Sequence, residues 1–218
     1  MCPKSNLGSR VAQGVSISVQ LSTERVIQMV VAVESNTTRK HMVETMVKVQ
    51  QKVKGEDTYW KRWLWDETKP ILLVLANYPA SKNLLEEDLT GILIRNAVLD
   101  RGEYGGVIIA NLFTRPVKWP SDKSLSAAFA EDSMVELVKA CHEANQVVIA
   151  VGSLPSRSLV ALARIQEFWE ACKKENMAKK VTLLVNSKGK PVHPLAIRNE
   201  PWQFSGWQTD WMKGAKTE

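Results

Sequence analysis

Four short apolar runs in the last two thirds of the chain most constrain what it can fold into. They read PILLVLAN at 70–77, GVIIANLF at 106–113, QVVIAVG at 146–152 and KVTLLVN at 180–186. Each is rich in Val, Ile or Leu and lacks the polar alternation of a half-exposed strand, which is typical of strands buried on both faces. We therefore expect four interior strands.

Helical patterns separate these runs. EEDLTGILIRNAVLDRG (86–102) ends at a glycine, EDSMVELVKACHEAN (131–145) begins with Asp132 or Ser133 as a cap, and SRSLVALARIQEFWEACKKEN (156–176) is the longest. Repeated alternation of strand and helix implies right-handed crossovers. The sequence thus predicts an α/β fold, a three-layer sandwich around a central, mainly parallel four-stranded sheet.

The region before the first of these strands carries a different pattern. ERVIQMVVAVE (24–34) is compatible with a strand or the start of a helix, whereas TTRKHMVETMVKVQQKVKG predicts an amphipathic helix from a Thr37 or Thr38 cap to Gly55. We expect three parts: an N-terminal extension at 1–55, an α/β domain at 56–200 and a tryptophan-containing tail at 201–218.

Composition narrows the class of protein. Hydrophobic residues make up 44% and charged residues 24% of the chain, and no apolar run approaches the roughly 20 residues of a membrane helix. The N-terminal stretch MCPKSNLGSRVAQGVSISVQ lacks the apolar segment of a secretory signal. We expect a cytoplasmic protein.

The cysteines and the charge bear on cofactors and partners. Cys2, Cys141 and Cys172 lie far apart without a CxxC pair, which argues against a zinc site, an iron-sulfur cluster and a disulfide framework. We expect no metal and no cofactor. The net charge of +6, concentrated between Arg157 and Lys190, favours a positive surface for a polyanion such as nucleic acid. The oligomeric state stays open.

Polar segments follow each of the four apolar runs. They read NYPASKN from Asn77, NLFTRPVKWP from Asn111, GSLPSRS from Gly152 and SKGKPVHP before Leu195. Ligands of open parallel sheets bind outside the carboxyl ends of the strands, because loops and helix N-termini converge there. We therefore expect these segments to form the functional site.

Each candidate residue also has a purely structural interpretation. Asn77 suits a turn as well as a site. The amide of Asn111 can match a nucleobase edge or satisfy a loop backbone. His193 either stabilises a turn or contacts a ligand.

The loops after the second and third runs have similar alternatives. The loop after the second run carries aromatic and basic side chains close together, namely Arg115, Lys118 and Trp119. These side chains could stack on a base and bind a nucleic-acid backbone, or they could simply pack the loop. The loop after the third run leads into a helix. The free N–H groups at the start of that helix would attract a phosphate, or they would simply be capped. The residues concerned are Gly152, Ser153, Ser156, Arg157 and Ser158.

The motifs RWLWDE, NYPAS, GVIIANLF, VVIAVG and above all SKGKPVHPLAI, in this order, resemble the bacterial domain-of-unknown-function family 1643 over about residues 59–200. Their order is also similar, more distantly, to the uracil-DNA glycosylase superfamily. That superfamily has a polar residue and a proline after the first strand, an asparagine after the second and a His-Pro pair after the last. The similarity implies a monofunctional enzyme that hydrolyses the N-glycosidic bond of a base in DNA and leaves an abasic site.

The superfamily resemblance implies roles for individual residues. A flipped-out nucleotide would enter the crevice, Asn111 would read the base edge, and His193 would stabilise negative charge on the departing base. Tyr78 stands where the superfamily usually has an aspartate or asparagine that handles the water. Asn77 or Asp88 would then take that task.

Ala80 stands where strict uracil enzymes carry a bulky aromatic, which implies a pocket open to a 5-substituted pyrimidine, such as the modified bases of phage DNA. A role in phage defence would follow, with repair as the other setting. The resulting candidates are catalytic Asn77, Asp88 and His193; base-binding Tyr78, Ala80, Asn111 and Phe113; and DNA- or phosphate-binding Ser81, Lys82, Arg115, Lys118, Trp119, Ser153, Ser156, Arg157, Lys188 and Lys190.

Two other functions stay open. An enzyme that processes a free nucleoside or nucleotide would need the phosphate-ready GSLPSRS segment but not a basic surface. A non-catalytic nucleic-acid binding module is favoured by Tyr78, since the water-handling residue is displaced. Such a module would bind DNA in a salt-dependent way and leave no abasic sites.

Overall fold

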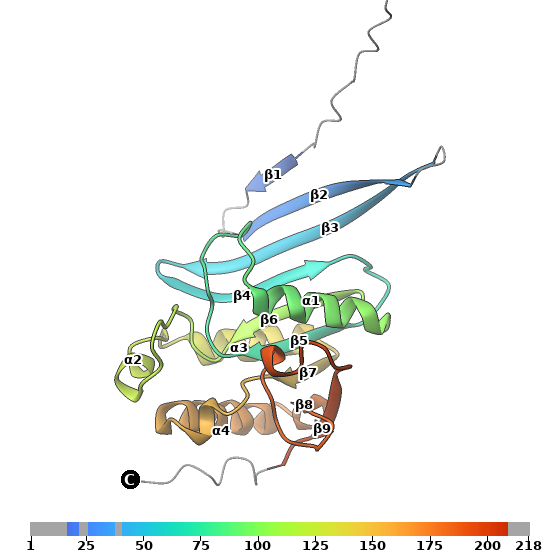
Figure 1. Ribbon diagram of the computed structural model, residues 1–218. Helices are drawn as coiled ribbons and strands as arrows, with labels where there is room; N and C mark the ends of the chain where they lie inside the picture. The colour runs from blue at the N-terminus through green and yellow to red at the C-terminus, as the bar shows by residue number, and fades with distance from the viewer. Residues whose placement is uncertain (1–16, 22–25, 38–40, 209–218) are drawn as a thin grey trace, which may run out of the picture.

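The computed structural model describes the backbone of residues 17–21, 26–37 and 41–208 and the side chains of residues 45–208. Its strands form one sheet in the order β1-β2-β3-β4-β6-β5-β7-β8-β9 (Figure 1). The strands are β1 (Ile17–Leu21), β2 (Val26–Thr37), β3 (His41–Lys54), β4 (Asp57–Leu64), β5 (Ile71–Ala76), β6 (Gly106–Asn111), β7 (Gln146–Ile149), β8 (Val181–Val185) and β9 (Gln203–Gly206). The α-helices are α1 (Leu89–Arg101), α2 (Asp122–Ser126), α3 (Ser133–Glu143) and α4 (Leu159–Lys174), and the 3-10 turns are η1 (Leu154–Ser156), η2 (Ala178–Lys180) and η3 (Pro194–Ile197).

The four apolar runs form the parallel centre of the sheet. β5 pairs in parallel with β6 and with β7, and β7 pairs in parallel with β8. Consecutive residues of these strands are buried, as expected where both faces of a sheet are covered. The prediction of an α/β fold with these four strands is confirmed.

The sheet is wider and more mixed than the sequence predicted. β4 pairs antiparallel with β6, and β9 pairs antiparallel with β8, so both sides of the parallel centre are flanked. β1, β2 and β3 continue the antiparallel flank beyond β4. The expected four-stranded parallel sheet is therefore the centre of a larger mixed sheet.

The prediction of a helix up to Gly55 is wrong, because residues 41–54 form the long strand β3. This strand pairs with β2 on one side and β4 on the other. Alternate positions from Val43 to Val53 carry mostly β-branched residues. A period of two with branched side chains favours a pleated strand, and the pairing decides between the two patterns.

Helices cover both faces of the sheet. Leu72 of β5 packs with Ile94 of α1 on one face. The next residue, Leu73, packs on the opposite face with Leu137 of α3 and Phe168 of α4. Burying each such side chain contributes roughly 1.5–3 kcal/mol, so both layers stabilise the strands whose ends carry the site.

The helix boundaries follow local hydrogen bonds. Asp88 caps α1, which ends at Gly102 in a left-handed conformation with φ 66°. Ser158 caps α4. Asp132 precedes α3 but makes no cap hydrogen bond, since its carboxylate accepts one from the hydroxyl of Tyr59 at 2.7 Å.

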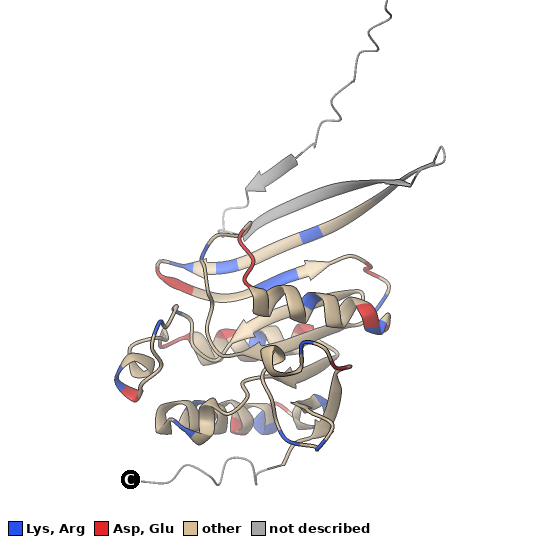
Figure 2. Cartoon of the chain, viewed as in Figure 1, with Lys and Arg blue, Asp and Glu red and all other residues tan. Residues whose placement is uncertain are grey.

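Lys and Arg residues are interspersed with Asp and Glu residues over the helices and over β4 (Figure 2). Along α4, Arg164 pairs with Glu167 at 2.9 Å and Lys173 pairs with Glu170 at 2.7 Å. Part of the positive charge expected in this region is therefore balanced locally. Within the described segments, no helix has the length and apolar character needed to cross a membrane.

Candidate functional site

A cavity of about 480 Å³ opens at the carboxyl ends of β5 and β6. Its walls come from the loop between β5 and α1, the first turns of α1, the loop after β6, the segment after β8, and β4. Small-molecule sites typically measure roughly 300–1,000 Å³. The cavity thus has the size of a ligand site and lies at the end of the sheet where the topology places one.

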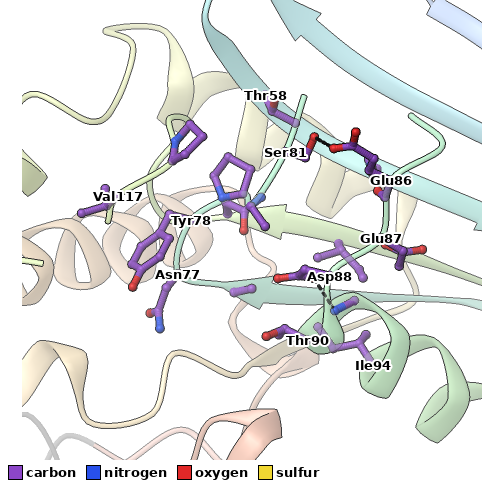
Figure 3. Close-up of a pocket in the computed structure, with 18 of the residues that line it drawn as sticks. Thr58, Asn77, Tyr78, Ser81, Glu86, Glu87, Asp88, Thr90, Ile94 and Val117 are labelled. Atoms are coloured by element: carbon purple, nitrogen blue, oxygen red, sulfur yellow. Dashed lines mark hydrogen bonds between the residues drawn. The ribbon is translucent and has the colours of Figure 1, made fainter. Parts of the chain in front are cut away.

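Eight of the predicted residues line this cavity: Asn77, Tyr78, Ala80, Ser81, Asp88, Asn111, Lys118 and His193. They belong to three segments far apart in the sequence, which the parallel strands bring to one place. Figure 3 shows several of them around the same space.

The two asparagines lie at the ends of neighbouring strands. Ala76 is opposite Asn111 in the β5–β6 register, and the carbonyl of Asn77 accepts a hydrogen bond from the amide of Phe113 at 2.9 Å. The side-chain Oδ1 of Asn77 is buried and has no hydrogen-bond partner among the described residues. An unpaired buried acceptor typically costs about 1–3 kcal/mol, so this amide is a candidate for a bound water or a ligand contact.

His193 is held as a neutral ring with a defined tautomer. Its Nδ1 accepts a hydrogen bond from the amide of Leu195 at 3.3 Å, which leaves the ring proton on Nε2. Burial lowers the pKa of His193, while the negative charge of Asp88 opposes that shift. Gly152 lies directly against it, because a Cβ on Gly152 would be 2.9 Å from the Cβ of His193.

Three consecutive carboxylates, Glu86, Glu87 and Asp88, line the cavity at the start of α1. Hydrogen bonds from Ser81 and Asn83 lower the pKa of Glu86, whereas burial raises the pKa of Glu87. The three side chains thus have different electrostatic surroundings. Across the described residues, no group of three or more His, Cys, Asp or Glu side chains is arranged to hold a metal ion.

β4 contributes lining residues that sequence reasoning missed: Thr58, Lys61 and Trp63. The Nζ of Lys61 donates to the carbonyls of Asn83 at 2.9 Å and Glu86 at 2.7 Å, so it fastens the loop between β5 and α1 to the sheet. Burial lowers the pKa of Lys61, against the effect of the neighbouring carboxylates. The aromatic run DTYWKRWL was the available signal, since such runs favour strands.

Four predicted residues near the cavity have other surroundings. Phe113 is fully buried in the core. Arg115 pairs with Asp57 through Nε at 2.9 Å, and its Nη2 donates to the second carboxylate oxygen at 3.1 Å. Lys82 pairs with a glutamate of the β3–β4 turn. Trp119 is 77% exposed and does not line the cavity, so stacking by Trp119 stays a prediction.

The remaining predicted residues, Ser153, Ser156, Arg157, Lys188 and Lys190, do not line the cavity. Ser156 donates its hydroxyl hydrogen to the carbonyl of Ser153 at 2.8 Å within η1. Lys188 and Lys190 lie on an exposed turn after β8, so their contact with a phosphate backbone also stays a prediction.

The start of α4, a predicted phosphate site, already has local partners. Ser158 accepts a hydrogen bond from the amide of Ala161 at 3.1 Å and donates one to the carboxylate of Asp122. A carboxylate at this place satisfies the helix dipole and repels a phosphate. The structure therefore favours the capping interpretation here.

Comparison with known proteins identifies the family of this chain. No curated protein and no solved structure matches the chain. The family described as protein of unknown function (DUF1643) matches residues 58–195, which include the lining residues from Thr58 to Leu195. This match covers more than half of the sequence, and the chain therefore belongs to the DUF1643 family.

Proposed function

We propose that this protein is a glycosylase-like enzyme that hydrolyses the N-glycosidic bond of a 5-substituted pyrimidine in DNA and leaves an abasic site. The observation that supports it most is the meeting of Asn77, Asn111 and His193 at one cavity. The amides offer donors and acceptors that match a base edge. The Nε2 proton of His193 suits the negative charge that develops on the departing base.

Asp88 is the carboxylate best suited to handle the water in this scheme. One of its oxygens accepts the cap hydrogen bond from the amide of Gly91 at 2.7 Å, which fixes the side chain at the cavity wall. As the bond from C1′ to the base breaks, the base leaves with the electron pair and is stabilised by His193. Water then adds to C1′ and gives its proton to Asp88.

Ala80 supports the choice of a 5-substituted base. It lies on the exposed part of the lining, so no bulky side chain closes the cavity at this position. Modified pyrimidines of phage DNA belong to this substrate class, and defence against phage is the biological role that we propose with it.

The test is abasic-site formation on DNA that contains uracil, thymine mispairs, or hydroxymethylated or glucosylated pyrimidines, followed by alkaline cleavage. We expect scission at one of the modified pyrimidines, with rates lowered about 10²–10³-fold by Asn111→Ala and by His193→Ala. The matched controls are Asn96→Ala and His142→Ala, since neither residue lines this cavity. A wild-type protein that leaves all these bases intact would contradict the proposal.

A second candidate, hydrolysis of a free nucleoside, is favoured by the charge around the cavity. Three carboxylates line it, and two predicted phosphate ligands, Lys82 and Arg115, are engaged in ion pairs. Such surroundings suit a ligand without a phosphate backbone. Release of base from the free nucleoside at a rate equal to that from DNA would favour this candidate.

A further inference from the structure

The cavity is larger than a single base requires. A cavity of about 150 Å³ holds one benzene ring, whereas this one measures about 480 Å³. Figure 3 shows Asn77 and Tyr78 at one side of the lining and Glu86 and Glu87 at the other. We call the second side the α1 compartment and define it by the lining residues Lys61, Trp63, Glu87, Gly91 and Ile94.

Gly91 maintains the shape of the α1 compartment. It is buried in the first turn of α1, where a Cβ would lie 2.5 Å from Oε1 of Glu87 and 3.1 Å from Oδ1 of Asp88. Glycine is a poorer helix former than alanine, so the local helix gains no stability from it. Its presence leaves the Glu87 carboxylate room beside the helix.

Glu87 is the partly buried member of the three carboxylates, whereas Glu86 and Asp88 are exposed. Asp88 caps α1, and Glu86 accepts hydrogen bonds from Ser81 and Asn83. The side chain of Glu87 is 18% exposed, and its Oε2 lies 3.4 Å from an Nη1 of Arg95. That distance is long for a charged hydrogen bond. Glu87 thus retains acceptor capacity at the cavity wall.

The charge balance of the lining favours a cationic group. The acidic members are Glu86, Glu87 and Asp88, and the basic ones are Lys61 and Lys118. Two of the donors of Lys61 are directed to backbone carbonyls of the loop. Trp63 and Ile94 are apolar members of the same lining and belong to one buried core cluster, so this side of the cavity also has an apolar wall.

We propose that the α1 compartment binds the substituent of the pyrimidine, and that this substituent ends in a primary amine that donates a hydrogen bond to Glu87. This inference rests on the proposed function for the base itself. An ammonium group offers three donors and a positive charge, which complement Oε1 of Glu87, the carboxylate oxygen that is not paired with Arg95.

The test is equilibrium binding of two nucleosides, 5-aminomethyl-2′-deoxyuridine and thymidine, measured by titration calorimetry near pH 7. The pair differs in the amine and not in the ring. We expect the amine to bind about tenfold more tightly, the effect of one charge-assisted hydrogen bond. Glu87→Gln and Gly91→Ala should reduce this preference to about twofold. Glu170→Gln, on the exposed face of α4, is the matched control and should keep it.

Equal affinities in the wild type, or a preference that survives Glu87→Gln in a folded variant, would overturn the inference. Thermal melting of each variant shows whether it is folded. Because binding needs no bond cleavage, the two proposals fail separately. A preference without abasic sites would contradict the glycosylase alone, and abasic sites without a preference would contradict the substituent site alone.

Discussion

The hydrogen bond from the Leu195 amide to Nδ1 of His193 determines what this ring can do near neutral pH. Burial lowers the pKa of His193, so the folded protein keeps the ring neutral into more acidic solution than an unperturbed histidine. The unfolded chain binds this proton more readily. The contribution of His193 to stability is therefore complete above about pH 6.5 and is lost as the pH falls toward the lowered folded pKa.

We expect an NMR titration of the His193 ring to give a midpoint below about 6.5. His193→Gln assigns the resonance. The same variant should lose part of the dependence of stability on acidic pH, measured by urea unfolding across the range. A midpoint above the ordinary histidine value would show that the ring is not held as described.

Gly152 and Gly189 form a matched pair of substitutions. Both have a left-handed backbone, with φ 61° and 71°, but only Gly152 has a close neighbour, namely His193. Alanine at either site costs roughly 1–2 kcal/mol for the backbone alone. We expect Gly152→Ala to cost more than Gly189→Ala in urea unfolding and, in addition, to slow base release, because it displaces His193. Equal losses in both variants would contradict this.

At the scale of single residues, the sequence located the strand ends but not the partners of their side chains. Asn111 and His193 could be predicted to meet because each follows a buried strand of one parallel sheet. Arg115 could not be assigned, since its partner Asp57 precedes the first predicted strand. Phe113 was predicted at the cavity, but the chain turns after β6 and buries it.

At the scale of elements, α4 supports the end of β6 through one buried side chain. The Nη2 of Arg164 donates to the carbonyl of Leu112 at 3.2 Å and to the hydroxyl of Ser133 at 3.0 Å. Its guanidinium lies 4.3 Å from the ring centroid of Phe129. Leu112 directly follows Asn111, so this helix holds the strand end that carries the candidate base-reading amide.

Arg164→Met should destabilise the protein by about 2 kcal/mol or more, because the Leu112 carbonyl and the Ser133 hydroxyl lose a buried donor. Glu167→Gln is the control. It removes only the exposed end of the same ion pair and should change the free energy of unfolding by less than about 1 kcal/mol. Urea denaturation measures both. Similar small losses would show that the buried contacts contribute little.

The elements differ in how far the sequence defines them. The continuous apolar runs of β5 to β8 identify interior strands by themselves. β3 does not, because its alternating valines are mixed with Lys, Gln and Glu at spacings that also suit a helix. Its state depends on pairing with β2 and β4, which is a non-local property that local periodicity does not contain.

At the scale of the whole molecule, the net charge of +6 should appear as salt-dependent binding if DNA is the substrate. Lys188→Gln combined with Lys190→Gln should reduce the slope of log affinity against log salt by about 1.8, that is about 0.9 for each lost phosphate contact. Lys139→Gln, in an ion pair on α3, is the control. Fluorescence anisotropy with labelled duplex measures the slopes, and an unchanged slope in the double variant would remove these two lysines from the DNA surface.

The strand β4 lines the cavity but carries none of the residues proposed for bond cleavage. Its Lys61 and Trp63 form a wall of the cavity, whereas the residues proposed for bond cleavage lie on the loops after β5 and β8. Substitutions at Trp63 can therefore alter which ligand is accepted while the cleavage residues stay the same, whereas Lys61 also fastens the loop that leads to Asp88. A library confined to this one strand is the natural starting point for redirecting the protein to a new substrate.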